Sequence, residues 1–219
     1  MTKLAIFDCD GTLVDSQANI CMAMEHAFEE AGLTPPMRHE TRRVVGLSLV
    51  ESMRMLLPEA ADDLHHDLAD KYRSAFWTLR SNGLVDEPLY DGMAALLSSL
   101  DESGWTLGVA TGKSDRGLTR CLDHHALRPL FVTLQTADRH PSKPHPSMVY
   151  QALAEAGADA ANAVVIGDTV YDIHMGRAAG TRTVGVNWGY HSVADLREAG
   201  ADYIAESMDD LKVYLENFA

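Results

Sequence analysis

The chain has 219 residues, of which 46% are hydrophobic and 23% charged, values typical of a soluble globular protein. Its net charge of −14 argues against partners such as nucleic acid or an anionic membrane, because an acidic surface repels both. Any phosphate group that the protein handles must therefore meet a local positive site. A chain of this length forms one large domain or a domain with an insertion.

The cysteines predict a reducing environment. They are Cys9, Cys21 and Cys121, an odd number without the spacing of a metal site. The chain enters its first predicted strand at Leu4 without a recognisable targeting signal, and no apolar stretch reaches the length of a transmembrane helix. We therefore expect a cytoplasmic protein, either a monomer or a homodimer.

Two acids follow the first predicted strand. Residues 4–7 are apolar throughout, which predicts a strand buried on both faces, as in a parallel sheet. Asp8 and Asp10 come directly after it, at the edge where open α/β sheets bind ligands. Residues two apart in an extended chain point to the same side, so we expect both carboxylates in one small volume, which requires a cation or a shared proton. A helix N-cap accounts for Asp15 or Ser16 but not for Asp8.

A helical insertion is predicted next. Apolar residues recur at helical spacing from about residue 20 until Gly32, then over about 48–57 before Pro58, and then over about 60–80. This pattern predicts a small helical bundle inserted after the first strand.

The remainder alternates between helix and strand. Helices are predicted over 91–103, 114–124 and 172–179, and strands over 105–111, 131–134, 163–169, 182–187 and 202–205. Alternation of this kind predicts an α/β fold with a doubly wound parallel sheet. We assign residues 1–15 and 88–219 to the α/β core and residues 16–87 to an inserted helical cap.

Several predicted strand ends carry polar residues. Asp168 follows its strand as Asp8 follows the first, so it should bring another carboxylate to the same edge, with Asp172 nearby. Thr111 and Lys143 lie at or near other strand ends. Carboxylates grouped in this way favour a hard divalent cation, Mg²⁺ before Zn²⁺, because histidine and cysteine have no obvious place among them.

Four short motifs resemble those of a known superfamily. They are DCDGT (8–12), ATGKS (110–114), SKPHP (142–146) and GDTVYD (167–172). In this order and spacing they resemble the four motifs of the haloacid dehalogenase superfamily of phosphohydrolases. The helical insertion resembles the cap of its phosphoglycolate phosphatase and β-phosphoglucomutase branch. The resemblance implies a Rossmann-like core and a Mg²⁺-dependent phosphatase that hydrolyses a small phosphorylated metabolite.

The resemblance also implies catalytic roles. Asp8 would be the nucleophile that forms an aspartyl-phosphate, and Asp10 would protonate the leaving alcohol and then activate water. Thr111 and the Gly112 amide would hold phosphate oxygens, while Lys143 would balance charge on the phosphate and the nucleophile.

The implied magnesium site uses residues from two motifs. Mg²⁺ would bind Asp8, the backbone carbonyl of Asp10, and Asp168, with Asp172 as a direct or an outer ligand. Asp172 could instead cap its helix, Thr111 could cap the helix after it, and Lys113 is expected at the surface. Four further side chains near the site are expected to be structural: His140, His145, Trp188 and Tyr190.

Related activities remain as alternatives. A haloacid dehalogenase would need neither the metal nor the second acid. A phosphonatase would need a cap lysine, and Lys71, the one lysine of the insertion, lies inside a predicted helix. A phosphomutase, the main alternative, would carry a histidine and an arginine where this chain has Ile20 and Leu49.

The substrate is predicted only by class. Compact anions such as 2-phosphoglycolate are the leading candidates. Arg42 or Arg43 in the predicted cap loop would then bind the carboxylate, with Arg43 named as the substrate contact, or both arginines could lie on a solvated helix face.

Overall fold

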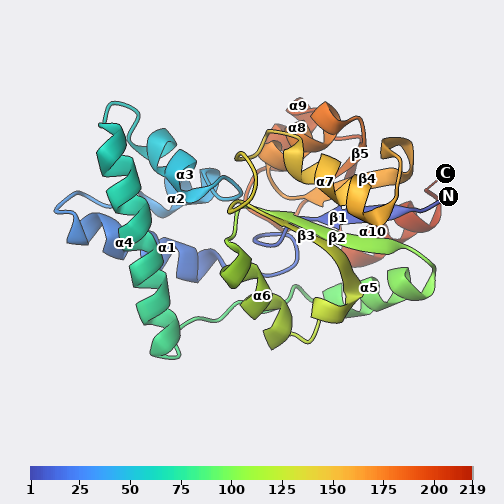
Figure 1. The fold of residues 1–219 in the computed structure, drawn as a ribbon, viewed down its shortest axis with the longest axis horizontal. Helices are drawn as coiled ribbons and strands as arrows, with labels where there is room; N and C mark the ends of the chain where they lie inside the picture. Colours follow the sequence, from blue (N-terminus) through green and yellow to red (C-terminus); the bar gives the residue numbers. More distant parts are fainter. Residues whose placement is uncertain (219) are drawn as a thin grey trace.

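One parallel sheet forms the centre of the larger part of the molecule (Figure 1). The computed structural model describes residues 1–218. The six strands lie in the order β3-β2-β1-β4-β5-β6, and every neighbouring pair is parallel. Their bounds are β1 (Leu4–Phe7), β2 (Thr106–Thr111), β3 (Phe131–Thr136), β4 (Ala163–Gly167), β5 (Arg182–Val186) and β6 (Tyr203–Ala205). The predicted doubly wound sheet is confirmed, and its strand order reverses between β1 and β4, where such sheets bind ligands.

Helices cover both faces of the sheet, which explains the uninterrupted apolar run in β1. Ala5 and Phe7 pack in one buried cluster with residues from three helices, and Leu4 and Ile6 pack in a second cluster on the other face. The first face carries α5 (Met93–Glu102), α6 (Asp115–His124) and α10 (Met208–Glu216). The second carries α7 (Ser147–Ala156) and α8 (Val170–Ala179), with α9 (Val193–Glu198) beside α8 (Figure 1). Two short 3₁₀ turns are Arg128–Leu130 and Ala160–Asn162.

The inserted helices form a lobe at one end of the sheet (Figure 1). They are α1 (Gln17–Glu30), α2 (Arg38–Arg43), α3 (Leu49–Leu56) and α4 (Asp62–Ser81). Their apolar faces share a hydrophobic cluster separate from those of the sheet, centred on side chains such as Phe28, Met53 and Leu68. We call residues 16–87 the cap and the remainder the core. These boundaries stay a prediction.

The sequence pattern missed three short helices. It predicted a loop where α2 forms, and it predicted no helix at α9 or α10. Both α2 and α9 have six residues, too few for an apolar face to repeat. No helix within residues 1–218 has both the length and the apolar character needed to cross a membrane.

Candidate active site

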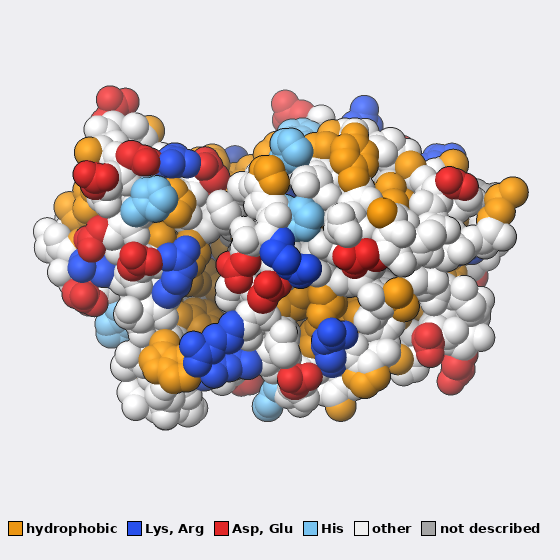
Figure 2. Space-filling view, in the orientation of Figure 1, with side chains coloured by type: hydrophobic (Ala, Val, Ile, Leu, Met, Phe, Trp, Pro, Cys, Tyr) orange, Lys and Arg blue, Asp and Glu red, His pale blue; other side chains and the backbone are white. Residues whose placement is uncertain are grey.

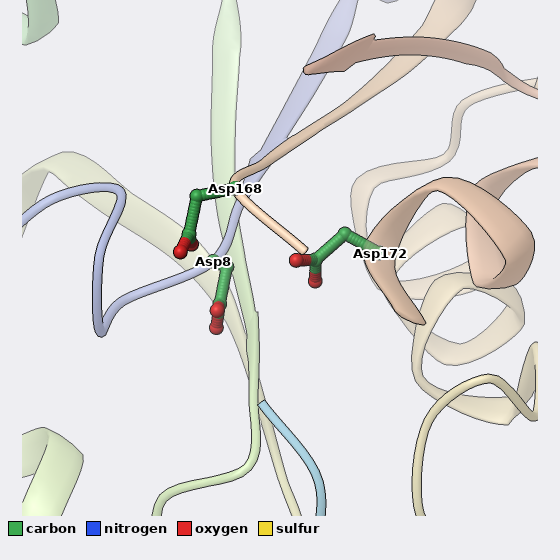
Figure 3. A group of neighbouring side chains, drawn as sticks. All are labelled: Asp8, Asp168 and Asp172. Carbon is green, nitrogen blue, oxygen red and sulfur yellow. The ribbon is translucent and has the colours of Figure 1, made fainter. Parts of the chain in front are cut away.

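Three buried carboxylates meet where the strand order reverses (Figure 3). Asp8 follows β1, Asp168 follows β4, and Asp172 lies in the first turn of α8. Each offers one oxygen, and these oxygens all lie within 4.8 Å of one another. Burial, together with the neighbouring acids, raises the pKa of Asp8 to about 7 despite Lys143, and it raises the pKa of Asp168 well above its usual range. Asp8 and Asp168 therefore hold their protons more tightly than a solvated aspartate does.

The first loop fixes the position of Asp168. Gly11 has φ of +83°, and a Cβ atom on it would lie 2.2 Å from Asp168 Oδ2, so only glycine fits here. The Thr12 hydroxyl donates to Asp168 Oδ1 at 2.9 Å, and the Tyr190 backbone N–H donates to Oδ2 at 2.9 Å. Neither donor was predicted from the sequence.

Asp172 has two structural roles at once. Its Oδ2 accepts from the Thr169 backbone N–H at 3.1 Å and from the Thr169 hydroxyl at 2.7 Å, which forms a capping box at the start of α8. Its Oδ1 accepts from Lys143 Nζ at 2.6 Å. Asp172 therefore caps its helix, as the alternative prediction held, and still belongs to the acidic group.

Lys143 is a buried cation between two of these acids. Its Nζ lies 2.9 Å from Asp8 Oδ1 and 2.6 Å from Asp172 Oδ1. Burial lowers the pKa of Lys143, but the two carboxylates outweigh this effect and raise it above its usual range. The side chain is fully buried, so Lys143 is not one more solvated lysine.

The acidic group fits a hard divalent cation. Within residues 1–218, neither oxygen of Asp8 accepts a well-aligned hydrogen bond, although the Lys143 ammonium is close to one of them. A buried acceptor without a donor costs about 1–3 kcal/mol, and a cation bound to the carboxylate would remove that cost. Because the donor atoms are all carboxylate oxygens, the group suits Mg²⁺ better than Zn²⁺.

The carboxylate of Asp10 does not join this group. Residues 9–14 fold into a tight turn, in which the Gly11 backbone N–H donates to the Val14 carbonyl, and Asp10 lines a neighbouring pocket. Its Oδ1 accepts from the Ser16 hydroxyl and pairs with Lys113 Nζ at 2.8 Å. Ser16 makes no side-chain cap to α1. The two acids therefore face adjoining spaces rather than one.

The surface position predicted for Lys113 is wrong. Its side chain is 11% exposed, and its Nζ lies 2.8 Å from Asp10 Oδ1 and 2.7 Å from Glu87 Oε1. Burial lowers the pKa of Lys113, but Asp10 and Glu87 raise it more, so it is well above its usual range. The other oxygen of Glu87 pairs with Arg80 of α4. Ion pairs thus connect Asp10 to the cap.

Thr111 and Gly112 lie where the core meets the cap. Thr111 is buried, and its hydroxyl oxygen accepts from the Lys113 backbone N–H at 3.2 Å. Ser114, not Thr111, caps α6, because its hydroxyl oxygen accepts from the Gly117 N–H at 3.1 Å. A Cβ atom on Gly112 would lie 2.5 Å from the Leu47 carbonyl oxygen, so the cap loop requires glycine here.

A pocket of about 280 Å³ lies beside Asp10, between the cap and the core. Figure 2 shows a hollow with hydrophobic side chains between these two parts of the molecule. Its lining includes Ile20 and Leu49, the apolar residues at the positions where a phosphomutase would have polar ones.

Arg42 and Arg43 do not line this pocket. The Arg43 side chain is exposed, while its backbone carbonyl accepts from the Tyr171 hydroxyl at 2.9 Å. The substrate role of Arg43 stays a prediction.

The other aromatic and imidazole side chains make structural contacts. Trp188 Nε1 donates to the Thr12 carbonyl at 3.2 Å, and the Tyr190 hydroxyl lies 3.2 Å from the Ser16 hydroxyl. His140 Nε2 lies 2.8 Å from Gln135 Oε1.

Comparison with known proteins identifies the family. Residues 5–186 match the haloacid dehalogenase-like hydrolase family model. The chain is 32% identical to a protein named probable phosphatase IndB from Dickeya dadantii, over 96% of this chain and 92% of that protein. It is 31% identical to pyrophosphatase PpaX from Bacillus pumilus, over 94% of this chain and 93% of that protein. It is 26% identical to phosphoglycolate phosphatase from Vibrio parahaemolyticus, over 95% of this chain and 94% of that protein.

A solved structure of a predicted phosphatase from Clostridium acetobutylicum superposes with a TM-score of 0.87 at 27% identity, covering 99% of both chains. Its fold therefore agrees with that of this protein along almost the whole chain. Together with the family match, this agreement confirms the resemblance that the four motifs indicated. The chain belongs to the haloacid dehalogenase-like hydrolases, among the phosphatases of that family.

Proposed function

We propose that the protein is a Mg²⁺-dependent phosphatase that hydrolyses a small phosphate monoester through an aspartyl-phosphate on Asp8. One observation carries the proposal: within residues 1–218, Asp8 is a buried carboxylate without a well-aligned donor. It lies beside the Lys143 ammonium and next to a pocket that Asp10 lines. The nucleophile and a charge-balancing cation thus lie together, and the proton donor lies in the adjoining pocket. Phosphoryl transfer needs these groups.

The first half of the reaction transfers the phosphoryl group to the protein. A carboxylate oxygen of Asp8 forms a bond to phosphorus as the ester P–O bond breaks, and Asp10 gives its proton to the departing oxygen. Lys143 balances negative charge on Asp8 and on the phosphate. Mg²⁺, held by Asp8, Asp168, the Asp10 carbonyl and Asp172, would supply further charge neutralisation.

The second half regenerates the protein. Asp10, now ionised, takes a proton from a water molecule, whose oxygen attacks phosphorus, and the bond from phosphorus to Asp8 breaks to release phosphate. We assign the Thr111 hydroxyl and the Gly112 amide to the phosphate oxygens, since both lie at the end of β2 beside this space.

The substrate we propose is a free metabolite whose alcohol carries an anionic group, with 2-phosphoglycolate as the first candidate. The names of two relatives support this class, since phosphoglycolate and pyrophosphate both release an anionic leaving group. Arg43 is kept as a proposed contact to that group, although its exposed side chain would have to move to reach it.

We further propose a cytoplasmic enzyme, monomeric or homodimeric, that acts on neither nucleic acid nor membrane. The net charge of −14 supports the absence of polyanionic partners. Three buried cysteines, an odd number without the spacing of a metal site, support a reducing compartment.

Phosphorus NMR separates this function from that of a phosphomutase. With Mg²⁺, the spectra should show inorganic phosphate growing as 2-phosphoglycolate is consumed. The side chains of Ile20 and Leu49 have no polar atoms that could bind a sugar phosphate in a second orientation. We therefore expect that β-glucose 1-phosphate is not isomerised. Accumulation of glucose 6-phosphate without matching inorganic phosphate would favour the mutase instead.

A further inference from the structure

Arginines gather at the pocket although the chain as a whole is acidic. Arg73 and Arg80 reach it from α4, and Arg116 and Arg120 reach it from α6. In Figure 2, lysine and arginine side chains lie beside the hollow between cap and core. Among residues 1–218, Asp10 is the one Asp or Glu in the pocket lining. This local excess of positive charge favours an anionic ligand.

Trp77 holds two of these arginines in place. The guanidinium carbon of Arg116 lies 4.1 Å from the centre of the Trp77 ring, and that of Arg120 lies 4.6 Å from it. Arg116 and Arg120 are four residues apart and share one face of α6, while Trp77 comes from α4. An indole ring attracts a guanidinium but accepts none of its conventional hydrogen bonds. The N–H groups of both arginines therefore stay available to a ligand.

The same two arginines have no acidic partner among residues 1–218. Arg73 and Arg80 each form an ion pair with a carboxylate outside the pocket lining. No ion pair is found for Arg116 or Arg120 within the described part of the chain, residues 1–218. Partial burial, with the positive charges of Arg116 and Arg80, lowers the pKa of Arg120, although a guanidinium remains charged at neutral pH. An anion bound between Arg116 and Arg120 would offset the repulsion between their positive charges.

The rest of the pocket suits an apolar body larger than glycolate. Tyr72 and Phe76 line it together with Ile20 and Leu49. Its volume of about 280 Å³ is close to the lower end of the range of about 300–1,000 Å³ found for small-molecule sites. A two-carbon leaving group would leave part of this apolar space filled with water.

We propose that Arg116 and Arg120 form a subsite for a second anionic group, carried by a leaving group with an apolar body. This inference rests on the proposed function and deepens it, because Asp10 lies in the same pocket and would protonate the oxygen of that leaving group. A carboxylate and a phosphate monoester both match the fork of N–H donors that arginine presents.

Three esters with the same ring test the subsite. Phenyl phosphate has no second anion, 4-carboxyphenyl phosphate adds a carboxylate, and 1,4-phenylene bisphosphate adds a phosphate. Each is assayed for kcat/KM with the wild type, Arg116→Gln, Arg120→Gln and Arg197→Gln. Arg197 is the matched control, since it is an exposed arginine of α9 that does not line the pocket. Calorimetric titration of the same substitutions in an Asp8→Asn background gives Kd without turnover.

We expect one or both of the doubly anionic esters to exceed phenyl phosphate by about tenfold in kcat/KM and in affinity, the usual effect of a charged hydrogen bond. Arg116→Gln and Arg120→Gln should remove this preference and change the kcat/KM for phenyl phosphate less than about twofold. Arg197→Gln should keep the preference. Equal kcat/KM and Kd values for all three esters with the wild-type residues at 116 and 120 would overturn the subsite. Equal losses of kcat/KM on all three esters in Arg116→Gln and Arg120→Gln would also overturn it. If no ester releases phosphate but the preference in Kd persists, the proposed function fails while the subsite stands.

Discussion

The ammonium of Lys113 lies 2.8 Å from a carboxylate oxygen of Asp10, the residue proposed to donate a proton to the leaving group. Lys113 also lies 2.7 Å from Glu87, which pairs with Arg80 of the cap. The proposed acid is thus held in place from the C-terminal end of the cap. Lys113 is a positioning residue in this account, since it acts through Asp10.

Lys113→Met should therefore impair protonation of the leaving group. We expect kcat/KM, which reports the steps up to release of the leaving group, to fall at least about tenfold for an alkyl phosphate, whose alkoxide leaves poorly without a proton. The loss in kcat/KM should be much smaller for p-nitrophenyl phosphate. Lys71→Met is the control, because Lys71 pairs with Asp67 and Glu30 away from the pocket. Steady-state kinetics on both esters provide the measurement. Equal losses on the two esters would show that Lys113 does not act through Asp10.

Without metal, the protein should become less stable as the pH rises from about 4 to 7. Burial raises the pKa of Asp8 from 3.8 to about 7, so the folded state binds more protons than the unfolded state across this range. Stability present at low pH is thus lost as Asp8 ionises. In chelator, thermal melts should show a Tm that falls as the pH rises from about 4 to 7. Added Mg²⁺ should make the Tm depend less on pH. Asp8→Asn should also flatten it in chelator, whereas an unchanged slope in this variant would assign the effect to other groups.

Phosphate release should require a divalent cation. Asp8, Asp168 and Asp172 crowd negative charge where a phosphate dianion must also enter. Release from p-nitrophenyl phosphate should fall to background in chelator and return when Mg²⁺ is added in excess. Full activity in chelator would rule out the metal assignment.

Arg43→Ala tests the sequence-based hypothesis about the cap. If Arg43 binds the carboxylate of the substrate, its loss should cost about 1–3 kcal/mol in kcat/KM for 2-phosphoglycolate. Because its side chain is exposed and outside the pocket lining, this loss requires the side chain to move when the substrate binds. A change of less than about twofold in kcat/KM for Arg43→Ala would contradict the proposed contact.

The strand ends were predictable because their signals are local. An apolar run followed by an acid marks both Asp8 and Asp168, and parallel strands bring their carboxyl ends to one edge. The acidic group of Figure 3 follows from that rule together with strand order. Lys143 was marked by the motif around it, and the structure places it beside Asp8.

Contacts between distant segments were not predictable in this way. Lys113 is buried because Glu87, the last residue of the cap, pairs with it at 2.7 Å. The stacking of Arg116 on Trp77 depends on α4 facing α6, and nothing in either helix alone indicates that arrangement. Arg43 was singled out from its place in a loop, yet that stretch forms α2 and its side chain is exposed.

Asp8 is proposed as the nucleophile, and Asp8→Asn tests this role most directly. The amide keeps the shape of the side chain and cannot attack phosphorus, so the fold should persist while the rate of phosphate release falls at least ~10³-fold. Asp15→Asn, a change at an exposed neighbouring acid, should leave the rate within about twofold. The measurement is phosphate release from 2-phosphoglycolate and p-nitrophenyl phosphate with Mg²⁺, after circular dichroism has shown that both variants are folded. A folded Asp8→Asn protein that keeps a tenth of the wild-type rate would mean that water attacks phosphorus directly, and it would contradict the aspartyl-phosphate.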